Sequence, residues 1–187
     1  VLAELPTQAI WCAWSLGAVL AVRVAVAFPQ RVTRLITIAA NPCFVAQKDW
    51  PCGLTATNFS QFRQGIEQDA VQGLKRFVAL QCQGSLSYKQ DVRYLQAKLN
   101  EQAIPSLDSL QRGLELLAQD HRDLWQQVTV PQVAILGQED RLVPASLAQY
   151  LPRLWPTAQI VCIEHAAHVP FVSHCLQIIA FLTGDSP

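Results

Sequence analysis

Four short segments of the chain are almost continuously apolar and rich in β-branched residues, a pattern typical of strands that are buried on both faces of a sheet. These predicted strands cover residues 9–13, 34–40, 132–136 and 159–163. Apolar residues at helical spacing follow them, and the predicted helices cover residues 16–28, 146–154 and 175–182. Strand and helix therefore alternate toward both ends of the chain, which predicts a parallel sheet with helices packed on it.

The middle of the chain has a different pattern, because no convincing strand occurs within residues 44–128. Apolar positions instead recur at helical spacing, with polar faces between them, over residues 58–66, 70–82, 87–100 and 106–118. Ser106 can cap the last of these helices, and Asp108 falls in its first turn. An all-helical block inserted between two strands of one sheet is a cap. We therefore expect an α/β core in two parts, residues 1–43 and 129–187, with the cap over residues 44–128.

The chain has 187 residues, of which 51% are apolar, and this is enough for one core with an insertion. Lys and Arg total 14 and Asp and Glu total 14, so net charge favours neither nucleic acid nor an anionic membrane. The apolar stretches are interrupted before they reach the roughly 18 residues that a membrane span needs. We therefore expect a soluble monomer with no nucleic acid and no membrane among its partners.

The 6 cysteines include no Cys-x-x-Cys pair and no cluster with histidine at the spacing of a zinc site. No signal peptide or transit segment opens the sequence as given. We therefore expect buried free thiols in a reducing cytoplasm, and we expect no metal ion and no cofactor.

The segment "IWCAWSLGAVLAVRVAVAFP" places Ser15 between a predicted strand and a predicted helix. A nucleophile elbow has this arrangement, and its tight turn needs small residues two positions before and after the serine. Ala13 and Gly17 satisfy that need, although Ala13 stands where glycine is usual. The N–H of Leu16 would then face a developing oxyanion at the start of the helix. An ordinary helix N-cap also explains the serine, so the motif alone leaves both interpretations open.

A carboxylate follows the third predicted strand, in the segment "VAILGQEDRLVP". Asp140 comes three residues after Gly137, at a point where a side chain can leave the sheet edge and reach an imidazole. Glu139 is its direct neighbour, and a solvated pair of loop carboxylates is the alternative. We choose Asp140 as the candidate acid.

Three of the 4 histidines follow the last predicted strand, in the segment "IVCIEHAAHVPFVSH". His168 is the candidate base, because it falls in the loop past the strand and Pro170 fixes the chain just before the C-terminal helix. We interpret His165 and His174 as packing or surface residues, and His121 lies within the predicted cap. A histidine taken alone is more often structural than catalytic.

Chain order is stronger evidence than any one of these residues. Ser15, Asp140 and His168 each follow a predicted strand, and the helical block lies between the first and the second. The order Ser, Asp, His matches the α/β hydrolases and differs from the two other serine-hydrolase orders. The combination predicts a triad for nucleophilic catalysis.

Beyond the triad, the chain resembles one branch of the α/β hydrolases, the pimeloyl-carrier-protein methyl ester esterases of biotin synthesis. The resemblance covers nearly the whole chain and rests on "WSLGA", "FPQRVTRLITIAANPCFVAQKDWP", "RFVALQ", "LGQEDRLVP" and "LWPTAQIVCIEHAAHVPFVSH". It implies an α/β-hydrolase three-layer sandwich with a mainly parallel sheet and an inserted helical cap. It also implies a serine carboxylesterase that hydrolyses the methyl ester of pimeloyl-acyl-carrier protein through an acyl-enzyme on Ser15.

The same resemblance implies a surface for each part of the substrate. The acyl pocket would be lined by Trp14 and by one stretch of the cap, Phe77, Val78, Ala79, Leu80 and Gln81. The acidic acyl-carrier protein would bind the basic residues Arg76, Lys89 and Arg93, for which a solvated helix face is the alternative. Gln72 stands where the family tends to have another basic residue, which would weaken carrier binding.

The start of the chain departs from the family pattern. Earlier strands and a His-Gly-type loop normally supply the second oxyanion N–H, and no segment of the sequence corresponds to them. Three strands, a helix and their connections would take roughly 50 to 60 residues. We therefore expect an N-terminally truncated chain, and the loss of one oxyanion donor costs about 10² to 10³ in rate.

Two other interpretations stay open. One is a general short-chain carboxylesterase or another cap-bearing α/β hydrolase, such as an aminopeptidase or a carbon–carbon bond hydrolase. Basic cap residues around an acyl pocket favour a carrier-bound substrate, whereas an acidic cap would favour a free amino terminus. The other is an inactive truncated fragment that survives as a binding or folding unit.

Overall fold

The computed structural model describes residues 6–183. Within them, the sheet consists of β1 (Ala9–Trp14), β2 (Val32–Ile38), β3 (Gln132–Gly137) and β4 (Gln159–Ile163). The strands lie side by side in chain order, and every neighbouring pair is parallel. Because parallel strands all end at one edge of the sheet, the loops that follow β1, β3 and β4 meet there.

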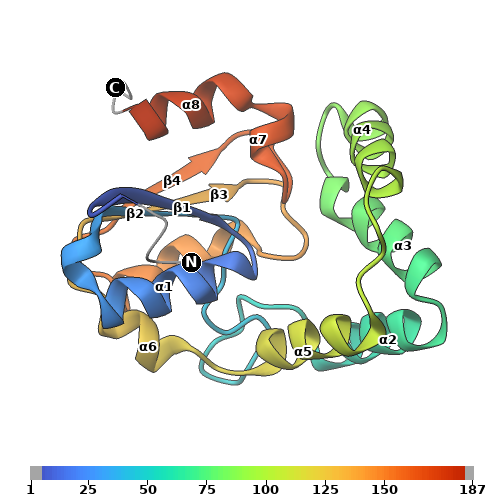
Figure 1. Cartoon of the computed structure of the whole chain (residues 1–187), viewed down its shortest axis with the longest axis horizontal. Coiled ribbons are helices and arrows are strands. Elements are labelled where there is room, and N and C mark those ends of the chain that lie inside the picture. Colours follow the sequence, from blue (N-terminus) through green and yellow to red (C-terminus); the bar gives the residue numbers. More distant parts are fainter. Residues whose placement is uncertain (1–5, 184–187) are drawn as a thin grey trace.

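The sheet is the middle of three layers. Helix α1 (Gly17–Ala27) packs on one face, and α8 (Cys175–Thr183) covers the opposite face (Figure 1). Side chains alternate between the faces of a strand, so Leu35 packs with the cluster under α1, whereas its neighbour Ile36 packs with Ile178 of α8. The expected parallel sheet between layers of helices is therefore confirmed.

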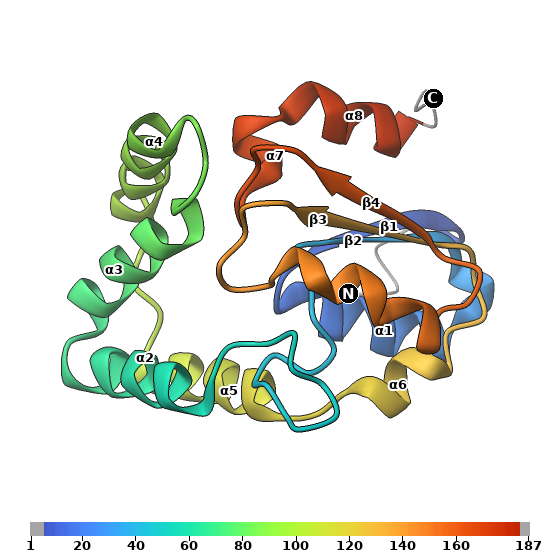
Figure 2. The same ribbon diagram turned by 180° about the vertical axis from the view of Figure 1, so that it is seen from behind.

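The helices of the middle segment are α2 (Ala56–Gln68), α3 (Ala70–Cys82), α4 (Tyr88–Asn100), α5 (Leu107–Ala118) and the short α6 (Arg122–Gln126). Of these, α3 and α4 stand beside the carboxyl edge of the sheet, opposite the ends of β3 and β4, whereas α6 packs against α1 (Figure 2). Side-chain oxygens of Thr55, Asp69 and Ser106 accept backbone N–H groups at the starts of α2, α3 and α5. Each such cap stabilises its helix by about 1 kcal/mol, and together they fix where these helices begin.

The structure differs from the predicted elements in four places. Residues 146–154 do not form an α-helix but two 3₁₀ segments, η3 (Ala145–Gln149) and η4 (Leu151–Arg153). Pro152 has no N–H to donate to an earlier turn, which explains why the helix does not continue. The short helices α6 and α7 (Pro170–Ser173) and the 3₁₀ turn η2 (Pro29–Arg31) were not predicted, because so few residues show no periodicity. The other predicted strands and helices are confirmed within two residues at most of their ends.

All six cysteines are free, as expected, but only three of them are buried. Burial raises the pKa of Cys43 and Cys52 to about 11 and that of Cys82 to about 12, so these thiols are poor nucleophiles. The expectation of buried thiols is wrong for the other three, which are exposed on the outer strands and at the start of α8, namely Cys12, Cys162 and Cys175.

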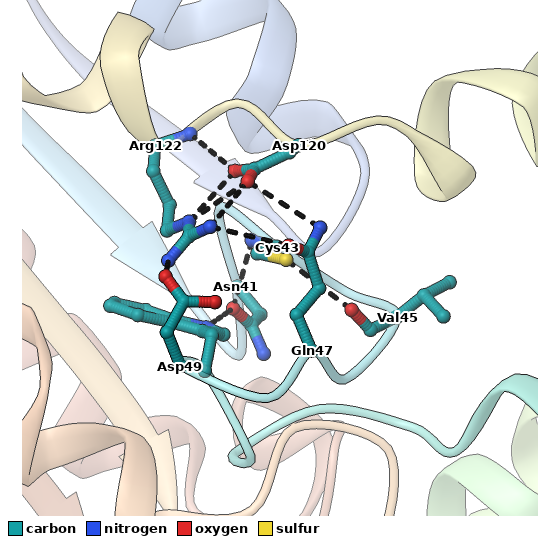
Figure 3. A network of polar contacts seen from close by, with 8 residues as sticks. Asn41, Cys43, Val45, Gln47, Asp49, Asp120 and Arg122 are labelled. Atoms are coloured by element: carbon teal, nitrogen blue, oxygen red, sulfur yellow. Dashed lines mark hydrogen bonds and ion pairs between the residues drawn. The ribbon is translucent and has the colours of Figure 1, made fainter.

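The two ends of the helical insertion are joined by a polar network around Arg122 (Figure 3). The guanidinium donates to Asp49 at 2.6 Å and to Asp120 at 2.7 Å, and it lies 5.3 Å from the ring centre of Trp50. Hydrogen bonds from Arg122 lower the pKa of both carboxyl groups. The indole of Trp50 donates in turn to Asn41, in the loop that leaves β2. The loop into the insertion and the loop out of it are therefore held together at the core.

Among residues 6–183, no helix combines the length and the apolar character that crossing a membrane requires.

Candidate active site

Ser15 occupies the turn between β1 and α1, with a left-handed φ of 50°. Its N–H donates to the carbonyl of Ile38 at 2.9 Å, which ties the turn to β2. A non-glycine residue in this conformation costs on the order of 1 kcal/mol, and it brings the side chain to the carboxyl edge of the sheet. The next N–H, that of Leu16, lies at the positive end of the α1 dipole.

Gly17 is the point where the reasoning about the turn was wrong. A side chain at this position was expected to clash, but apart from its chain neighbours and the backbone of α1 itself, a Cβ atom built there meets no described atom within 4 Å. Gly17 therefore begins α1 without a steric need for glycine among residues 6–183.

His168 joins Ser15 to Asp140. Its Nε2 lies 2.9 Å from Ser15 Oγ, and its Nδ1 lies 2.7 Å from Asp140 Oδ2. The other carboxylate oxygen, Oδ1, accepts the N–H groups of Leu142 and Val143 at 2.8 and 3.0 Å. The His168 and Asp140 side chains are 1% and 0% exposed, so water does not compete for these bonds. The carboxylate favours a proton on Nδ1, which leaves Nε2 to accept the Ser15 proton.

The neighbouring alternatives do not take part in this arrangement. Glu139 is exposed and is not bonded to His168, whereas Asp140 is buried. His121 bonds the Leu116 carbonyl in the cap, and His174 bonds Ser173. His165 is exposed and has a left-handed φ of 60°. The structure thus brings together the three residues that chain order selected.

A cavity of about 660 Å³ lies between α2 and α3. Phe77 and Leu80 line it, and Phe62 stacks on Phe77 with 4.6 Å between ring centres. Arg76 and Arg141 add positive charge to the lining, which includes neither Ser15 nor His168. The cavity is therefore mainly apolar with a basic part, and it lies beside the triad rather than around it.

The other residues expected at the acyl pocket are placed differently. Val78, Ala79 and Trp14 do not belong to the lining of that cavity. Gln81 is buried at the end of α3, and its carbonyl accepts the N–H of His168 at 3.0 Å. The last turn of α3 therefore connects the cavity to the catalytic edge through the backbone.

The three residues expected to bind the carrier, Arg76 on α3 and Lys89 and Arg93 on α4, are all exposed. None of them forms an ion pair within the described part of the chain. Their charge is therefore available to an acidic partner. Gln72, which was expected to weaken carrier binding, donates its backbone N–H to the side chain of Asp69 at the start of α3.

Sequence reasoning missed several residues of the site. The amides of Leu142 and Val143 fix the acid, and the only signal for them is their position two and three residues after Asp140. Arg141, from the same loop, lines the cavity, and nothing in the sequence indicated that this residue would reach it. The indole of Trp14 donates to the backbone of His168, a contact 154 positions apart in the chain.

Comparison with known proteins gives two kinds of similarity. Residues 1–180 match the model of the alpha/beta hydrolase family. The chain is also 41% identical over 186 residues to a pimeloyl-[acyl-carrier protein] methyl ester esterase of Pectobacterium atrosepticum, a match that covers 97% of this chain and 72% of that protein. A protein with the same name from Klebsiella pneumoniae is 38% identical over 188 residues, covering 98% of this chain and 73% of that one.

Two solved structures share the fold at lower identity. An esterase from Exiguobacterium antarcticum superposes with a TM-score of 0.80 at 20% identity, covering 96% of this chain and 66% of that one. A bromoperoxidase from Bacillus anthracis gives a TM-score of 0.83 at 17% identity, covering 98% and 70%. Both likenesses concern the fold alone.

Proposed function

The chain belongs to the alpha/beta hydrolase family, and on that premise we propose that it is a serine carboxylesterase acting on the methyl ester of a pimeloyl group held by acyl-carrier protein. The catalytic part of this proposal rests on the continuous series of hydrogen bonds from Ser15 through His168 to Asp140. The relatives at about 40% identity, which are named for this reaction, support the choice of substrate.

Ser15 is the nucleophile in this proposal. As its Oγ attacks the ester carbonyl, its proton passes to His168 Nε2, 2.9 Å away. Asp140 stabilises the imidazolium that forms, and the Leu16 N–H donates to the tetrahedral oxyanion. His168 then protonates the departing methoxy group, so methanol leaves and the pimeloyl group stays on Ser15. Attack by water, with the same proton transfers, releases the pimeloyl group as a carboxylate still attached to its carrier.

Substrate recognition is assigned to the cap. The acyl chain would lie along residues 77–81, which run from the apolar cavity to the carbonyl that bonds His168. Trp14 was placed in the same pocket by resemblance, and its observed contact is with His168. The acidic carrier would bind the exposed charges of Arg76, Lys89 and Arg93, which have no ion-pair partner among residues 6–183 and would attract and orient an acidic surface on the cap.

The division into core and cap belongs to the same proposal, with residues 44–128 forming one substrate-binding unit. A carrier-bound biosynthetic substrate is consistent with a location in the cytoplasm. The cytoplasmic location and the monomeric state both stay predictions.

The test is methanol release from pimeloyl-carrier methyl ester by the full chain, with p-nitrophenyl butyrate as a second substrate. We expect both esters to be hydrolysed and the carrier-bound ester to give the higher kcat/KM. Hydrolysis of the small ester alone would favour a general short-chain carboxylesterase. Failure on both would contradict the proposed esterase function for this chain.

A further inference from the structure

The backbone of His168 is held from two sides by groups far away in the sequence. Its N–H donates to the carbonyl of Gln81 at 3.0 Å, at the end of cap helix α3. Its carbonyl accepts the indole Nε1–H of Trp14 at 2.8 Å. Trp14 is the last residue of β1 and directly precedes Ser15. One side chain on the nucleophile strand is therefore bonded to the residue that carries the candidate base.

Trp14 also packs against the imidazole itself. The two rings are 5.6 Å apart between centres with an angle of 54°. Phe171, in α7, makes an edge-on contact with the indole, with ring centres 5.2 Å apart and an angle of 76°. The indole thus contacts both the ring of His168 and the helix that follows the histidine loop, and these contacts restrict its rotation.

We propose that Trp14 is a positioning residue for His168, holding the imidazole within reach of Ser15 Oγ through its indole N–H and ring, and not a substrate-binding residue. The inference rests on the proposed function. During the reaction the imidazole must receive a proton from Ser15 and deliver it to the departing oxygen, so a small rotation about the loop lengthens the 2.9 Å contact. The peptide carbonyl of His168 is bonded directly to the Cα that carries the imidazole, and Trp14 donates a hydrogen bond to it.

The loop itself supplies reasons why such an anchor is needed. It contains His165 with a left-handed φ of 60°, and its backbone bond to the acid loop runs from the Glu139 N–H to the Ala166 carbonyl. That bond fixes the first half of the loop. The second half, where His168 lies, is fixed by Gln81 and Trp14.

A matched pair of variants tests the proposal. Trp14→Phe keeps an aromatic ring and removes the indole N–H, whereas Trp11→Phe changes a tryptophan of the same strand that packs with the cluster on the α1 side of the sheet. With p-nitrophenyl acetate, which occupies little of the acyl pocket, we expect Trp14→Phe to lower kcat about threefold to tenfold and to leave KM within about twofold. Trp11→Phe should leave both kcat and KM within about twofold. Trp14→Tyr should be no more active than Trp14→Phe, because a tyrosine hydroxyl does not occupy the position of the indole N–H.

Two results would overturn the proposal. Equal kcat for Trp14→Phe and Trp11→Phe would show that the indole N–H does not matter for catalysis. A loss confined to KM would place Trp14 against substrate instead. If Trp14→Phe does not fold, the isosteric benzothienylalanine at position 14 removes the N–H alone, and the same outcomes apply.

A readout without turnover separates this inference from the proposed function. The proton between His168 Nδ1 and Asp140 gives a downfield NMR resonance when the pair is well aligned. We expect this resonance to shift or broaden in Trp14→Phe and to be unchanged in Trp11→Phe. An unchanged resonance in Trp14→Phe contradicts the positioning role, whereas wild-type protein that hydrolyses no ester contradicts the esterase function.

Discussion

The carboxyl edge of the sheet and the helical cap are built from different kinds of interaction. At the edge, ionisable side chains are buried and bonded to one another, as in the pair of His168 and Asp140 with 1% and 0% of their side chains exposed. On the cap, the basic side chains of Arg76, Lys89 and Arg93 are exposed and form no ion pair within the described residues, and Arg76 also lines a cavity that is mainly apolar. The first arrangement fixes one geometry, whereas the second leaves positive charge available to a partner.

The difference matters because the two regions meet at few polar points. At the catalytic edge the contact is the bond from the His168 N–H to the Gln81 carbonyl, and at the base of the cap it is the bond from the Trp50 indole to Asn41, beside the Arg122 network (Figure 3). Changes at the edge should therefore lower kcat on every ester. Changes on the cap should lower kcat/KM for a carrier-bound ester and leave small esters unaffected.

Removal of the nucleophile should have the largest effect. Ser15→Ala leaves the fold intact but removes the attacking oxygen, so we expect kcat on p-nitrophenyl butyrate to fall by about 10⁶. Ser173→Ala is the matched control, since that serine bonds His174 outside the triad. Residual turnover of Ser15→Ala close to that of Ser173→Ala would remove Ser15 from the mechanism.

The acid should come next. Asp140→Asn keeps the shape of the side chain but no longer favours the proton on Nδ1, and we expect kcat to fall by about 10⁴. Glu139→Gln, at the exposed neighbouring position, should stay within about twofold of the wild type. Steady-state kinetics of both variants decide between the two carboxylates, and a larger loss in Glu139→Gln would reverse the assignment.

Charge reversal on the cap should separate the two regions most clearly. Arg76→Glu combined with Arg93→Glu should lower kcat/KM for pimeloyl-carrier methyl ester about 10- to 100-fold, because an acidic carrier is then repelled. The small ester should be unaffected, and added salt should reduce the difference. Arg112→Glu, which reverses an exposed charge on α5, is the control. Equal losses on both esters would mean that these arginines act on the catalytic edge or on folding.

The smallest expected effect is on stability. Arg122→Gln removes the ion pairs with Asp49 and Asp120, and we expect urea denaturation at pH 7 to show a free energy of unfolding lower by about 1–2 kcal/mol. The pKa of both carboxyl groups is lowered in the folded protein, so their stabilisation is present above pH 4 or so and is lost as pH falls further. The difference between wild type and variant should therefore shrink at pH 3.

The control for this variant is Arg63→Gln, which breaks an exposed pair with Glu67 and should cost less than about 0.5 kcal/mol. If Arg122→Gln costs no more than Arg63→Gln at pH 7, the network does not hold the base of the cap.

The sequence predicted the parts of this molecule that depend on local pattern. Runs of β-branched residues located all four described strands, and for β4 (Gln159–Ile163) the predicted bounds agree with the observed ones. Because parallel strands end at a common edge, placing Ser15, Asp140 and His168 after strands was enough to predict that they meet. Their catalytic roles stay predictions, although the observed hydrogen bonds have the geometry that the roles need.

Contacts that depend on loop conformation could not be read from the sequence. Trp14 bonds His168 only because the loop after β4 folds back over β1, and no periodicity encodes that path. Arg122 forms ion pairs with Asp49 and Asp120, which lie in loops without a periodic pattern of apolar residues. The prediction of a helix at residues 146–154 was wrong for a local reason. The apolar spacing fits a helix, but Pro152 cannot donate the backbone hydrogen bond that a continuous helix needs.

The claim that Ser15 is an activated nucleophile is tested most directly by covalent labelling. The full chain is treated with a fluorophosphonate, which reacts with serines activated by a general base, and the modified peptide is identified by mass spectrometry. We expect one adduct, on Ser15, which is absent in Ser15→Ala and forms much more slowly in Asp140→Asn. No adduct on the wild-type chain, or an adduct on another serine that persists in Ser15→Ala, would contradict the claim.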